Sequence, residues 1–271
     1  MNAGRLDGRV AIVTGGGRGL GRAMVLGLAA AGARVIATAA RETAEVEAVA
    51  AESLGRGNVI PMIADVARDE DCARVVAMAH DRFGRLDILI NNAGRGMKYV
   101  SERFLTEPTR FWETDPDVWR MVIDTNVNGP FLMAQAAVSG MIAAGYGRIV
   151  NITMNHATMR RRGFSPYDTS KAVLESETVI WAQDLDGTGV TVNALLPGGA
   201  TATGMIPDGF PQDGLAKLLE PTIIVPPLLW LVSDASSGVT GGRLDASRWT
   251  REGSEADAAA AAMDDAGWCA N

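Results

Sequence analysis

Tyr167 and Lys171 are the residues of this sequence whose types and spacing best suit acid–base chemistry. Side chains four positions apart lie on one face of a helix. A free phenol, with a pKa of about 10, is a poor acid–base catalyst at neutral pH. A nearby ammonium favours the phenolate and brings the phenol pKa toward the working range. The same spacing is common in surface pairs, so its meaning depends on a neighbouring site.

A glycine-rich segment, TGGGRGLG (14–21), supplies such a site. Glycine allows the backbone to approach a pyrophosphate, and the N-terminus of a following helix offers N–H donors and positive potential. Tight turns also need glycine, but this segment stands between the first predicted strand and the first predicted helix, as dinucleotide binding requires. The predicted cofactor contacts in it are Gly15, Gly17, Arg18, Gly19, Leu20 and Gly21.

The residues after the second predicted strand bear on the choice of dinucleotide. An acid about twenty positions after the loop accepts the ribose hydroxyls of NAD. The sequence IATAARE (36–42), which includes Ala39, has no carboxylate before Glu42. Arg18 and Arg41 are placed to meet a 2′-phosphate, although either also fits a solvated helix end. We therefore expect NADP(H) rather than NAD(H).

The elements that position these residues follow from a repeated pattern of a glycine followed by a short β-branched run. It occurs at residues 8–14, 32–38, 84–90, 147–153 and 189–195, with a further predicted strand at 58–64. Runs of this kind fit buried parallel strands, and the stretch 72–83 between two of them has one apolar helical face. The sequence predicts an α/β fold, a single-domain Rossmann-like doubly wound parallel sheet with helices on both faces.

Composition narrows the classes of protein. The 271 residues suit one large domain, which we place at 1–249, followed by a polar, Ala-rich tail at 250–271 that could be a short helix, a partner arm or disordered. A net charge of −7 with no basic block argues against nucleic acid or an anionic membrane as partner. With no leader-like or spanning segment and no disulfide or metal pattern from Cys72 and Cys269, we expect a reduced cytoplasmic protein without a metal site.

Six motifs, in order between residue 8 and about residue 245, resemble those of the short-chain dehydrogenase/reductase family. TGGGRGLG resembles its cofactor loop, ADV (64–66) its adenine contact, NNAG (91–94) its ribose-packing segment, and PGG (197–199) its nicotinamide-side turn. The second-strand region is similar to that of NADPH-dependent ketoacyl reductases. The resemblance implies further cofactor contacts at Asp65, Val66, Asn92, Ala93, Gly94, Tyr167, Lys171, Pro197, Gly198 and Thr201.

The remaining motifs resemble the catalytic residues of that family. YDTSK (167–171) matches its Y-x-x-x-K motif, and Asn126 resembles the helix asparagine that holds a proton-relay water. The resemblance implies that Tyr167 donates a proton to a carbonyl oxygen while NADPH delivers hydride to the carbon. It also implies a homotetramer or homodimer, packed through helices at 116–144 and 166–186.

Met154 departs from the family pattern, because the catalytic serine of the family precedes the tyrosine by thirteen residues. A thioether cannot donate a hydrogen bond, and losing one such donor costs about 2.7–4 kcal/mol. On an extended strand His156 would share the face of Met154 and replace the donor, unless it is a surface loop histidine. A bulge could instead bring in Thr153 or Asn155. The sequence leaves these alternatives open.

The substrate side is predicted from apolar residues outside any clean periodicity. The long segment 95–125 could line a pocket or form a satellite core, and 200–214 resembles a mobile lid. Arg160, Arg161 and Arg162 could steer an anionic substrate or form a solvated loop. The candidate pocket residues are Met97, Tyr99, Phe104, Phe111, Trp112, Met159, Phe164 and Met205.

These features favour an NADP(H)-dependent oxidoreductase that interconverts a carbonyl and an alcohol on a small molecule. The alternative is a catalytically weak dinucleotide-binding sensor or scaffold of the same fold, which Met154 favours and the intact Asn126, Tyr167 and Lys171 disfavour. Altered chemistry such as epimerisation is a third possibility, against which the intact cofactor loop counts.

Overall fold

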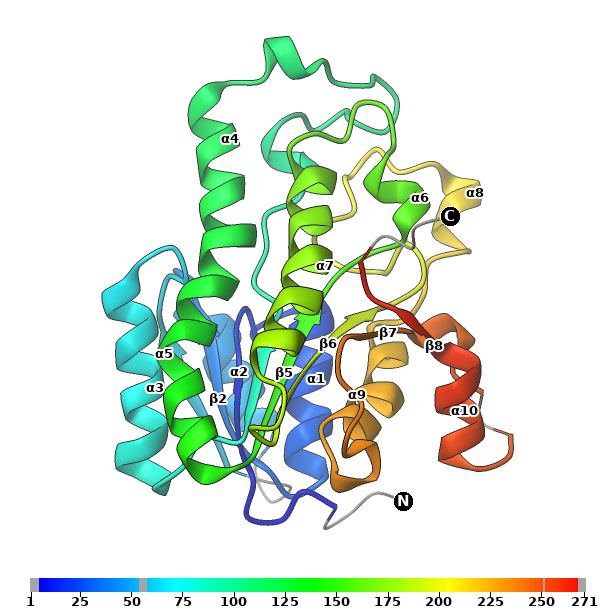
Figure 1. Ribbon diagram of the computed structural model, residues 1–271. Helices are drawn as coiled ribbons and strands as arrows, with labels where there is room; N and C mark the ends of the chain where they lie inside the picture. Colours follow the sequence, from blue (N-terminus) through cyan, green and yellow to red (C-terminus); the bar gives the residue numbers. More distant parts are fainter. Residues whose placement is uncertain (1–4, 54–57, 251, 268–271) are drawn as a thin grey trace.

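A single sheet organises the chain in the computed structural model, which describes residues 5–53, 58–250 and 252–267 (Figure 1). Its eight strands lie in the order β3-β2-β1-β4-β5-β6-β7-β8, all parallel except β8, which is antiparallel to β7. The strands are β1 (Val10–Val13), β2 (Arg34–Ala39), β3 (Asn58–Ile63), β4 (Ile88–Asn91), β5 (Gly147–Ile152), β6 (Val190–Leu196), β7 (Gly242–Asp245) and β8 (Met263–Asp265).

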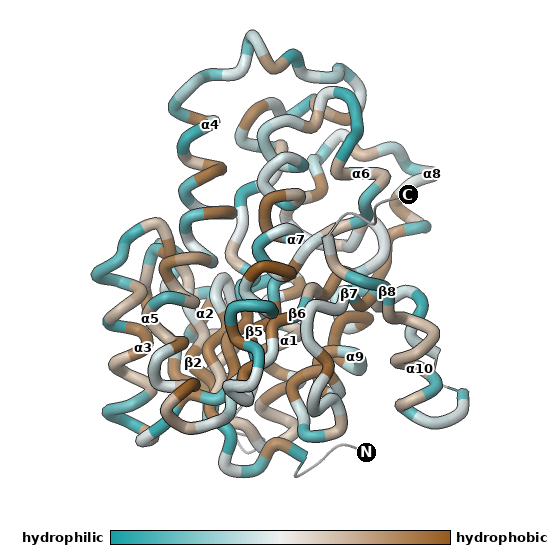
Figure 2. The backbone as a smooth tube through the Cα atoms, viewed as in Figure 1, coloured by the Kyte–Doolittle hydropathy of each residue, from teal (hydrophilic) through white to brown (hydrophobic). Residues whose placement is uncertain are grey.

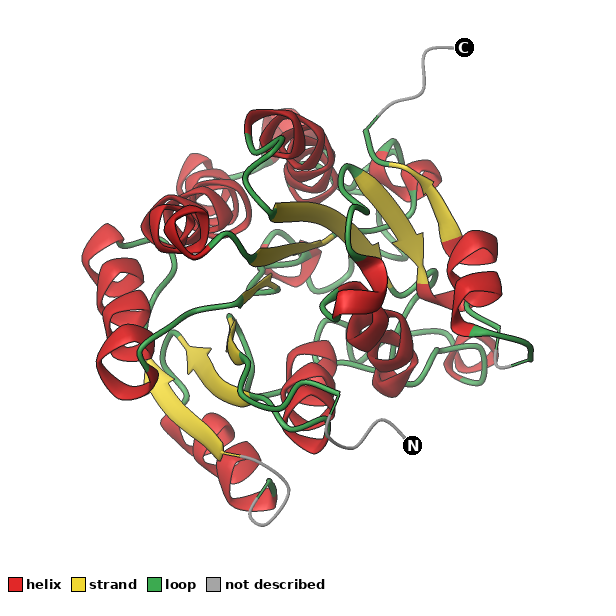
Figure 3. Ribbon diagram, turned by 60° about the horizontal axis from the view of Figure 1, so that its bottom comes forward, coloured by secondary structure: helices red, strands yellow, loops and turns green. Residues whose placement is uncertain are grey.

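Helices cover both faces of the sheet (Figure 3). The α-helices are α1 (Gly19–Ala30), α2 (Thr43–Glu52), α3 (Asp69–Phe83), α4 (Pro116–Ile123), α5 (Gly129–Ala144), α6 (His156–Met159), α7 (Tyr167–Asp184), α8 (Gln212–Leu215), α9 (Val225–Leu231) and α10 (Glu255–Ala262). Short 3₁₀ turns occur at Met97–Tyr99, Phe111–Glu113, Pro221–Ile224, Asp234–Ser236 and Ala246–Arg248.

Alternate residues of the strands pack into two separate hydrophobic cores, one on each face of the sheet. Ala11 and Val13 of β1 pack in a cluster with residues of α1, α2 and α9, whereas Val10 and Ile12 pack in a cluster with residues of α3, α5 and α7. Successive side chains of a strand point to opposite faces, so a strand buried on both faces must be apolar throughout. Figure 2 shows this concentration of apolar residues in the central sheet and along α9. The predicted doubly wound fold is confirmed.

The six predicted strands are β1 to β6, and the C-terminal segment adds two that the pattern did not indicate. Ser254 caps α10 by accepting a hydrogen bond from the Asp257 N–H, and Ala262 at its end is fully buried. β8 then pairs with β7 in the register Leu244 with Met263. The described part of the 250–271 segment is therefore a helix and an edge strand, while Cys269 lies outside the described residues.

One helical stretch runs without a break from Pro116 to Ala144 and contains a π turn at Asp124–Asn128. Among the described residues it alone is long and apolar enough to match a membrane span by length and composition, with 29 residues and a mean hydropathy of 1.2. Core helices of folded proteins meet the same test. Here α5 packs on α3, β4 and β5, so part of its apolar surface has partners inside the fold.

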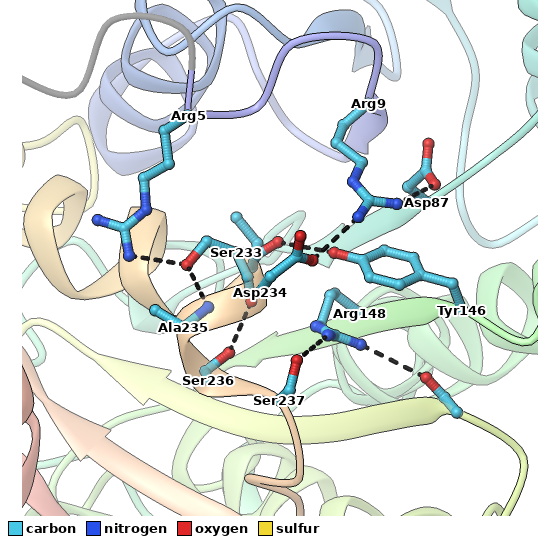
Figure 4. A network of polar contacts seen from close by, with 12 residues as sticks. Arg5, Arg9, Asp87, Tyr146, Arg148, Ser233, Asp234, Ala235, Ser236 and Ser237 are labelled. Atoms are coloured by element: carbon cyan, nitrogen blue, oxygen red, sulfur yellow. Dashed lines mark hydrogen bonds and ion pairs between the residues drawn. The ribbon is translucent and has the colours of Figure 1, made fainter.

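A polar network closes the end of the sheet where the central parallel strands begin (Figure 4). Asp87, whose side chain is 2% exposed, accepts hydrogen bonds from Arg9 and Arg85 and from the backbone N–H of Val10. The ring of Tyr146 lies 3.7 Å from the guanidinium carbon of Arg9. These contacts join the starts of β1, β4 and β5, which are far apart in the sequence.

We expect Asp87→Ala to lower the free energy of unfolding by about 1–3 kcal/mol, because it leaves the buried Val10 N–H without its acceptor and Arg85 without its anion. Chemical denaturation of the variant measures this loss. The matched control is Asp234→Ala, since Asp234 also pairs with Arg9 but its side chain is 76% exposed. That change should cost about 1 kcal/mol or less. Equal losses in the two variants would contradict the role assigned to Asp87.

Candidate active site

The glycine loop between β1 and α1 adopts a backbone that only glycine tolerates well. Gly15 has a φ of 64°, in the left-handed region. A Cβ on Gly21 would lie 2.0 Å from the carbonyl oxygen of Gly15, so any side chain there would push α1 away from the loop. Arg18, the N-cap of α1, makes no side-chain cap. The first N–H groups of α1 are therefore available to an anion.

A cavity of about 550 Å³ opens beside this loop. Its walls come from the loop, from the carboxyl ends of β2, β3 and β4, and from residues 203–205. The predicted cofactor residues that line it are Gly15, Gly17, Arg18, Gly19, Leu20, Gly21, Ala39, Arg41, Asp65, Val66, Asn92, Ala93 and Gly94. The predicted cofactor residues outside its lining are Tyr167, Lys171, Pro197, Gly198 and Thr201.

Asn92 locks the glycine loop to the NNAG segment that follows β4. Its Nδ2 donates to the carbonyl oxygens of Thr14 at 2.8 Å and Gly15 at 3.0 Å. Thr14 Oγ1 in turn accepts from the backbone N–H groups of Asn92 and Ala93, each at 3.0 Å. The two segments therefore form one rigid wall of the cavity.

Two carboxylates stand at the cavity beyond the end of β2: Glu42, the first acid that the sequence shows after the loop, and Glu45, which the sequence pattern did not single out. Glu42 and Glu45, beside and within the start of α2, both line the cavity. Glu45 lies 3.4 Å from Arg18 Nη1 in an ion pair, and the Arg18 side chain is 65% exposed. One of the two arginines expected to meet a 2′-phosphate thus has an anionic partner already. The signal in the sequence was the TAEVE start of the helix.

Asn126 sits in the π turn and joins the NNAG segment to α7. The residue is fully buried. Its Nδ2 donates to the Arg95 carbonyl at 3.0 Å and to Ser170 Oγ at 2.9 Å, while its Oδ1 accepts from the Arg95 N–H at 2.8 Å. π turns inside α-helices occur frequently at functional sites, because they redirect a side chain without ending the helix.

Lys171 on α7 lies close to Asn126 and to the NNAG segment. Its Nζ donates to the Ile152 carbonyl at the end of β5, at 2.7 Å. A Cβ placed on Gly94 would lie 3.5 Å from Asn126 Oδ1 and 3.9 Å from Lys171 Nζ. The cavity wall, the buried asparagine and the lysine therefore converge around Gly94. Burial lowers the pKa of Lys171 to about 8, although the charge of Glu175 opposes this shift.

The phenol of Tyr167 does not have the lowered pKa that its spacing from Lys171 suggested. Burial, and secondly the charge of Asp168, raise the pKa of Tyr167 to about 12. Lys171 gives its hydrogen bond to the Ile152 carbonyl instead of the phenol oxygen. Without a bound cofactor Tyr167 is therefore a protonated phenol and a weaker acid than free tyrosine.

Asp168 was missed because nothing in the residue pattern distinguishes it from the variable positions of the Y-x-x-x-K motif. It is 3% exposed, and neither carboxylate oxygen has a hydrogen-bond partner among the described residues. Burial raises its pKa to about 7, against the lowering effect of Arg161. A carboxyl that titrates near neutrality thus stands beside the phenol.

Three neighbours of Met154 were candidates for the missing hydrogen-bond donor: His156, Asn155 and Thr153. β5 ends at Ile152 and α6 begins at His156, so the strand alternation that would place His156 on the face of Met154 is wrong. The Nε2 of His156 lies 3.6 Å from the fully buried carboxylate of Glu175. Asn155 donates to the Gly198 carbonyl at 2.8 Å. Thr153 is buried, and its Oγ1 has no hydrogen-bond partner in the described part of the chain.

The predicted lid and substrate segment lie over this centre. Met205 Sδ is 4.0 Å from the Tyr167 hydroxyl and lies near Gly96. Met97, Phe104 and Phe164 form a small buried cluster against which Tyr167 packs. Tyr99 lines the cavity and Met159 is buried, whereas Phe111 and Trp112 are 70% and 67% exposed and do not line this cavity. Arg160, Arg161 and Arg162 are exposed.

The fold and the loop–helix geometry define a dinucleotide-binding α/β protein, and comparisons with known proteins make the class specific. The sequence model of the short chain dehydrogenase family matches residues 9–213. A 3-oxoacyl-[acyl-carrier-protein] reductase from Synechocystis is 36% identical over 71% of this chain and 74% of its own length. An acetoacetyl-CoA reductase from Shinella zoogloeoides is 33% identical over 88% of this chain and 96% of its own.

A solved structure agrees with these sequence matches. A Sinorhizobium meliloti protein assigned to the short-chain alcohol dehydrogenases superposes with a TM-score of 0.77 and 29% identity, over 87% of this chain and 93% of that one. The chain belongs to the short-chain dehydrogenase/reductase family of NAD(P)-dependent oxidoreductases, as its motifs predicted.

Proposed function

We propose that this protein is an NADP(H)-dependent oxidoreductase that interconverts a carbonyl and an alcohol on a small molecule. The observation that carries the proposal is the convergence of Asn126 and Lys171 on Gly94, at the wall of the cavity beside the glycine loop. Relatives named for reducing 3-oxoacyl and acetoacetyl thioesters support a β-keto thioester as the first substrate class to test.

The cavity fits a dinucleotide because its loop has no room for side chains. A Cβ on Gly17 would lie 2.8 Å from the Cβ of Glu45, and Gly19 has a φ of 53°. Gly15, Gly19 and the start of α1 would hold the pyrophosphate, Asp65 and Val66 the adenine, and Asn92 to Gly94 the ribose. When bound, the nicotinamide supplies the hydride.

The chain itself handles the proton. Tyr167, as a phenol, donates its proton to the carbonyl oxygen of the substrate during reduction. The Lys171 ammonium, which lies on the same face of α7, stabilises the phenolate that remains after the proton transfer. Two hydrogen bonds hold the start of α7 in place: Asn126 Nδ2 donates to Ser170 Oγ, and Lys171 Nζ donates to the Ile152 carbonyl.

The rate of carbonyl reduction is expected to fall as pH rises through about 8, the pKa of Lys171. Below that pKa the amine is an ammonium and supports the phenolate. Above it the amine is neutral, and the support is lost. A kcat profile between pH 6 and 10 measures the midpoint, with Lys171→Met as the control that should lose this limb. A wild-type profile that is flat across pH 8 would contradict the assignment.

Preference for the phosphorylated cofactor rests on the absence of an acid at Ala39 and on the exposed Arg41 at the cavity edge. Arg41→Ala should weaken NADPH binding by about tenfold, because one charge-assisted phosphate contact is worth roughly 1.5 kcal/mol or more. NADH binding should stay within twofold. Fluorescence titration with both cofactors tests this, and an equal loss for both would place Arg41 away from the 2′-phosphate.

A second candidate function is a weakly catalytic sensor or scaffold that binds the dinucleotide, and Met154 is the observation that favours it. The thioether offers no donor to a substrate oxygen. Turnover by the wild-type chain distinguishes the two candidates.

We also propose assembly as a homotetramer or homodimer through the faces of α5 and α7. Phe131 and Ile142 on α5 are 49% and 44% exposed, and Ile180 on α7 is 48% exposed. Large apolar side chains exposed on neighbouring helices are typical of a subunit interface. Light scattering on the purified protein tests this proposal.

A further inference from the structure

A buried ion pair lies beneath the turn that follows β5. Glu175 on α7 has a side chain with no exposed surface, and the side chain of Arg243 on β7 is 6% exposed. Arg243 Nε donates to Glu175 Oε1 at 3.1 Å. Neither residue lines the cavity described above.

Arg243 extends this pair to the backbone of Met154. Its Nη2 donates to the Met154 carbonyl at 2.9 Å. Two residues earlier, the Ile152 carbonyl accepts from Lys171 Nζ at 2.7 Å. Two cations from different elements therefore hold alternate carbonyls of the short segment 152–154, which ends where the family places its substrate-facing side chain.

Glu175 is the anion common to these contacts. It follows Lys171 by one helical turn, and its charge favours the ammonium form of that lysine. Its Oε2 accepts from the Gly267 N–H at 3.3 Å and lies 3.6 Å from His156 Nε2. The elements α6, α7, β7 and the segment after β8 meet at this one carboxylate.

We propose that Arg243 and Glu175 are positioning residues that set the place of residue 154 relative to Tyr167. Burying a matched ion pair adds little to stability, because the loss of hydration offsets the attraction. Its directional hydrogen bonds nevertheless tie the Met154 carbonyl to β7, the strand between β6 and the edge strand β8. The effect on turnover rests on the proposed reductase function, whereas the effect on the position of Met154 does not.

The test compares the wild-type protein with the double variant Arg243→Leu/Glu175→Leu, which removes both charges and keeps an apolar core. The ¹³C-methyl NMR resonance of Met154, assigned with Met154→Leu, reports its surroundings without any need for activity. We expect a shifted or broadened Met154 resonance and a thermal midpoint near that of the wild type. With acetoacetyl-CoA as the probe, kcat should fall by about tenfold or more while the Kd for NADPH stays within twofold.

Two further variants keep the test decisive. Arg243→Lys retains the charge beside Glu175 but is too short to reach both partners, so it should reproduce the NMR change even where the double variant fails to fold. Asp264→Asn is the matched control, because Asp264 lies 3.9 Å from Arg243 Nη1 and its side chain is 47% exposed. It should leave the resonance and kcat unchanged.

The outcomes separate this proposal from the proposed function. An unchanged Met154 resonance in Arg243→Lys, or in a folded double variant, would overturn the positioning role. A changed resonance in a protein that shows no turnover even as wild type would support positioning while the reductase function fails.

Discussion

Met154→Ser is expected to raise kcat for carbonyl reduction by roughly 10²–10³, the usual worth of one preorganised donor to a developing oxyanion. The wild-type thioether cannot donate, and the neighbouring candidates are engaged elsewhere. Asn155 bonds to the Gly198 carbonyl, and the Nε2 of His156 faces Glu175. Steady-state kinetics with NADPH and acetoacetyl-CoA measure the gain.

Met154→Ala is the matched control for this gain, because it removes the thioether without adding a donor and should leave kcat within a few-fold of wild type. An equal rise in the alanine variant would mean that Met154 acts by steric obstruction. No rise in the serine variant would mean that another group already donates to the oxygen, and the buried, unpartnered Thr153 hydroxyl would then be the first to test.

Tyr167→Phe should lower kcat by roughly 10²–10⁴, because it deletes the phenol that donates the proton to the substrate carbonyl oxygen. The variant loses a hydroxyl that contacts the Met205 sulfur at 4.0 Å, a weak contact, so the fold should be unaffected. Fluorescence titration should give an unchanged Kd for NADPH. Tyr99→Phe is the control, since Tyr99 lines the cavity but is 45% exposed and far from the catalytic helix in the chain.

Most of the fold was predictable because β1, β2, β4, β5 and β6 lie inside the sheet, are buried on both faces and must be apolar. They therefore stand out as Val- and Ile-rich runs after a glycine, and the edge strand β3 carries a similar apolar run. β7 and β8 were not predictable in this way. Their sequences, GRLD and MDD, carry charged residues that are held by partners distant in sequence, such as Glu175 with Arg243.

The site was predictable where chemistry depends on local spacing. The glycine loop, the NNAG segment and the Tyr167–Lys171 pair are each contiguous motifs, and the structure gathers most of their predicted residues at one cavity. What the sequence could not supply depends on tertiary contacts. The carboxyl of Asp168 titrates near neutrality because folding buries it, and His156 Nε2 lies 3.6 Å from Glu175, a residue of another helix.

The pKa of Tyr167 in this structure likewise depends on tertiary burial. Spacing on a helix places Lys171 on the same face as the phenol, and its Nζ donates to the Ile152 carbonyl. Burial, and secondly the charge of Asp168, raise the phenol pKa to about 12. The lowered pKa expected from the Lys171 ammonium together with the charge of an oxidised nicotinamide stays a prediction for the cofactor complex.

The most direct test of the proposed reductase function is NADPH oxidation by the wild-type protein across a panel of ketones, aldehydes and 3-oxoacyl thioesters. We expect measurable turnover of at least one carbonyl compound, and we expect Tyr167→Phe to abolish it. The contradicting result is a wild-type protein that binds NADPH but oxidises none of it with any member of the panel, while Met154→Ser gains activity. The protein would then be a dinucleotide binder whose catalytic hydroxyl is missing.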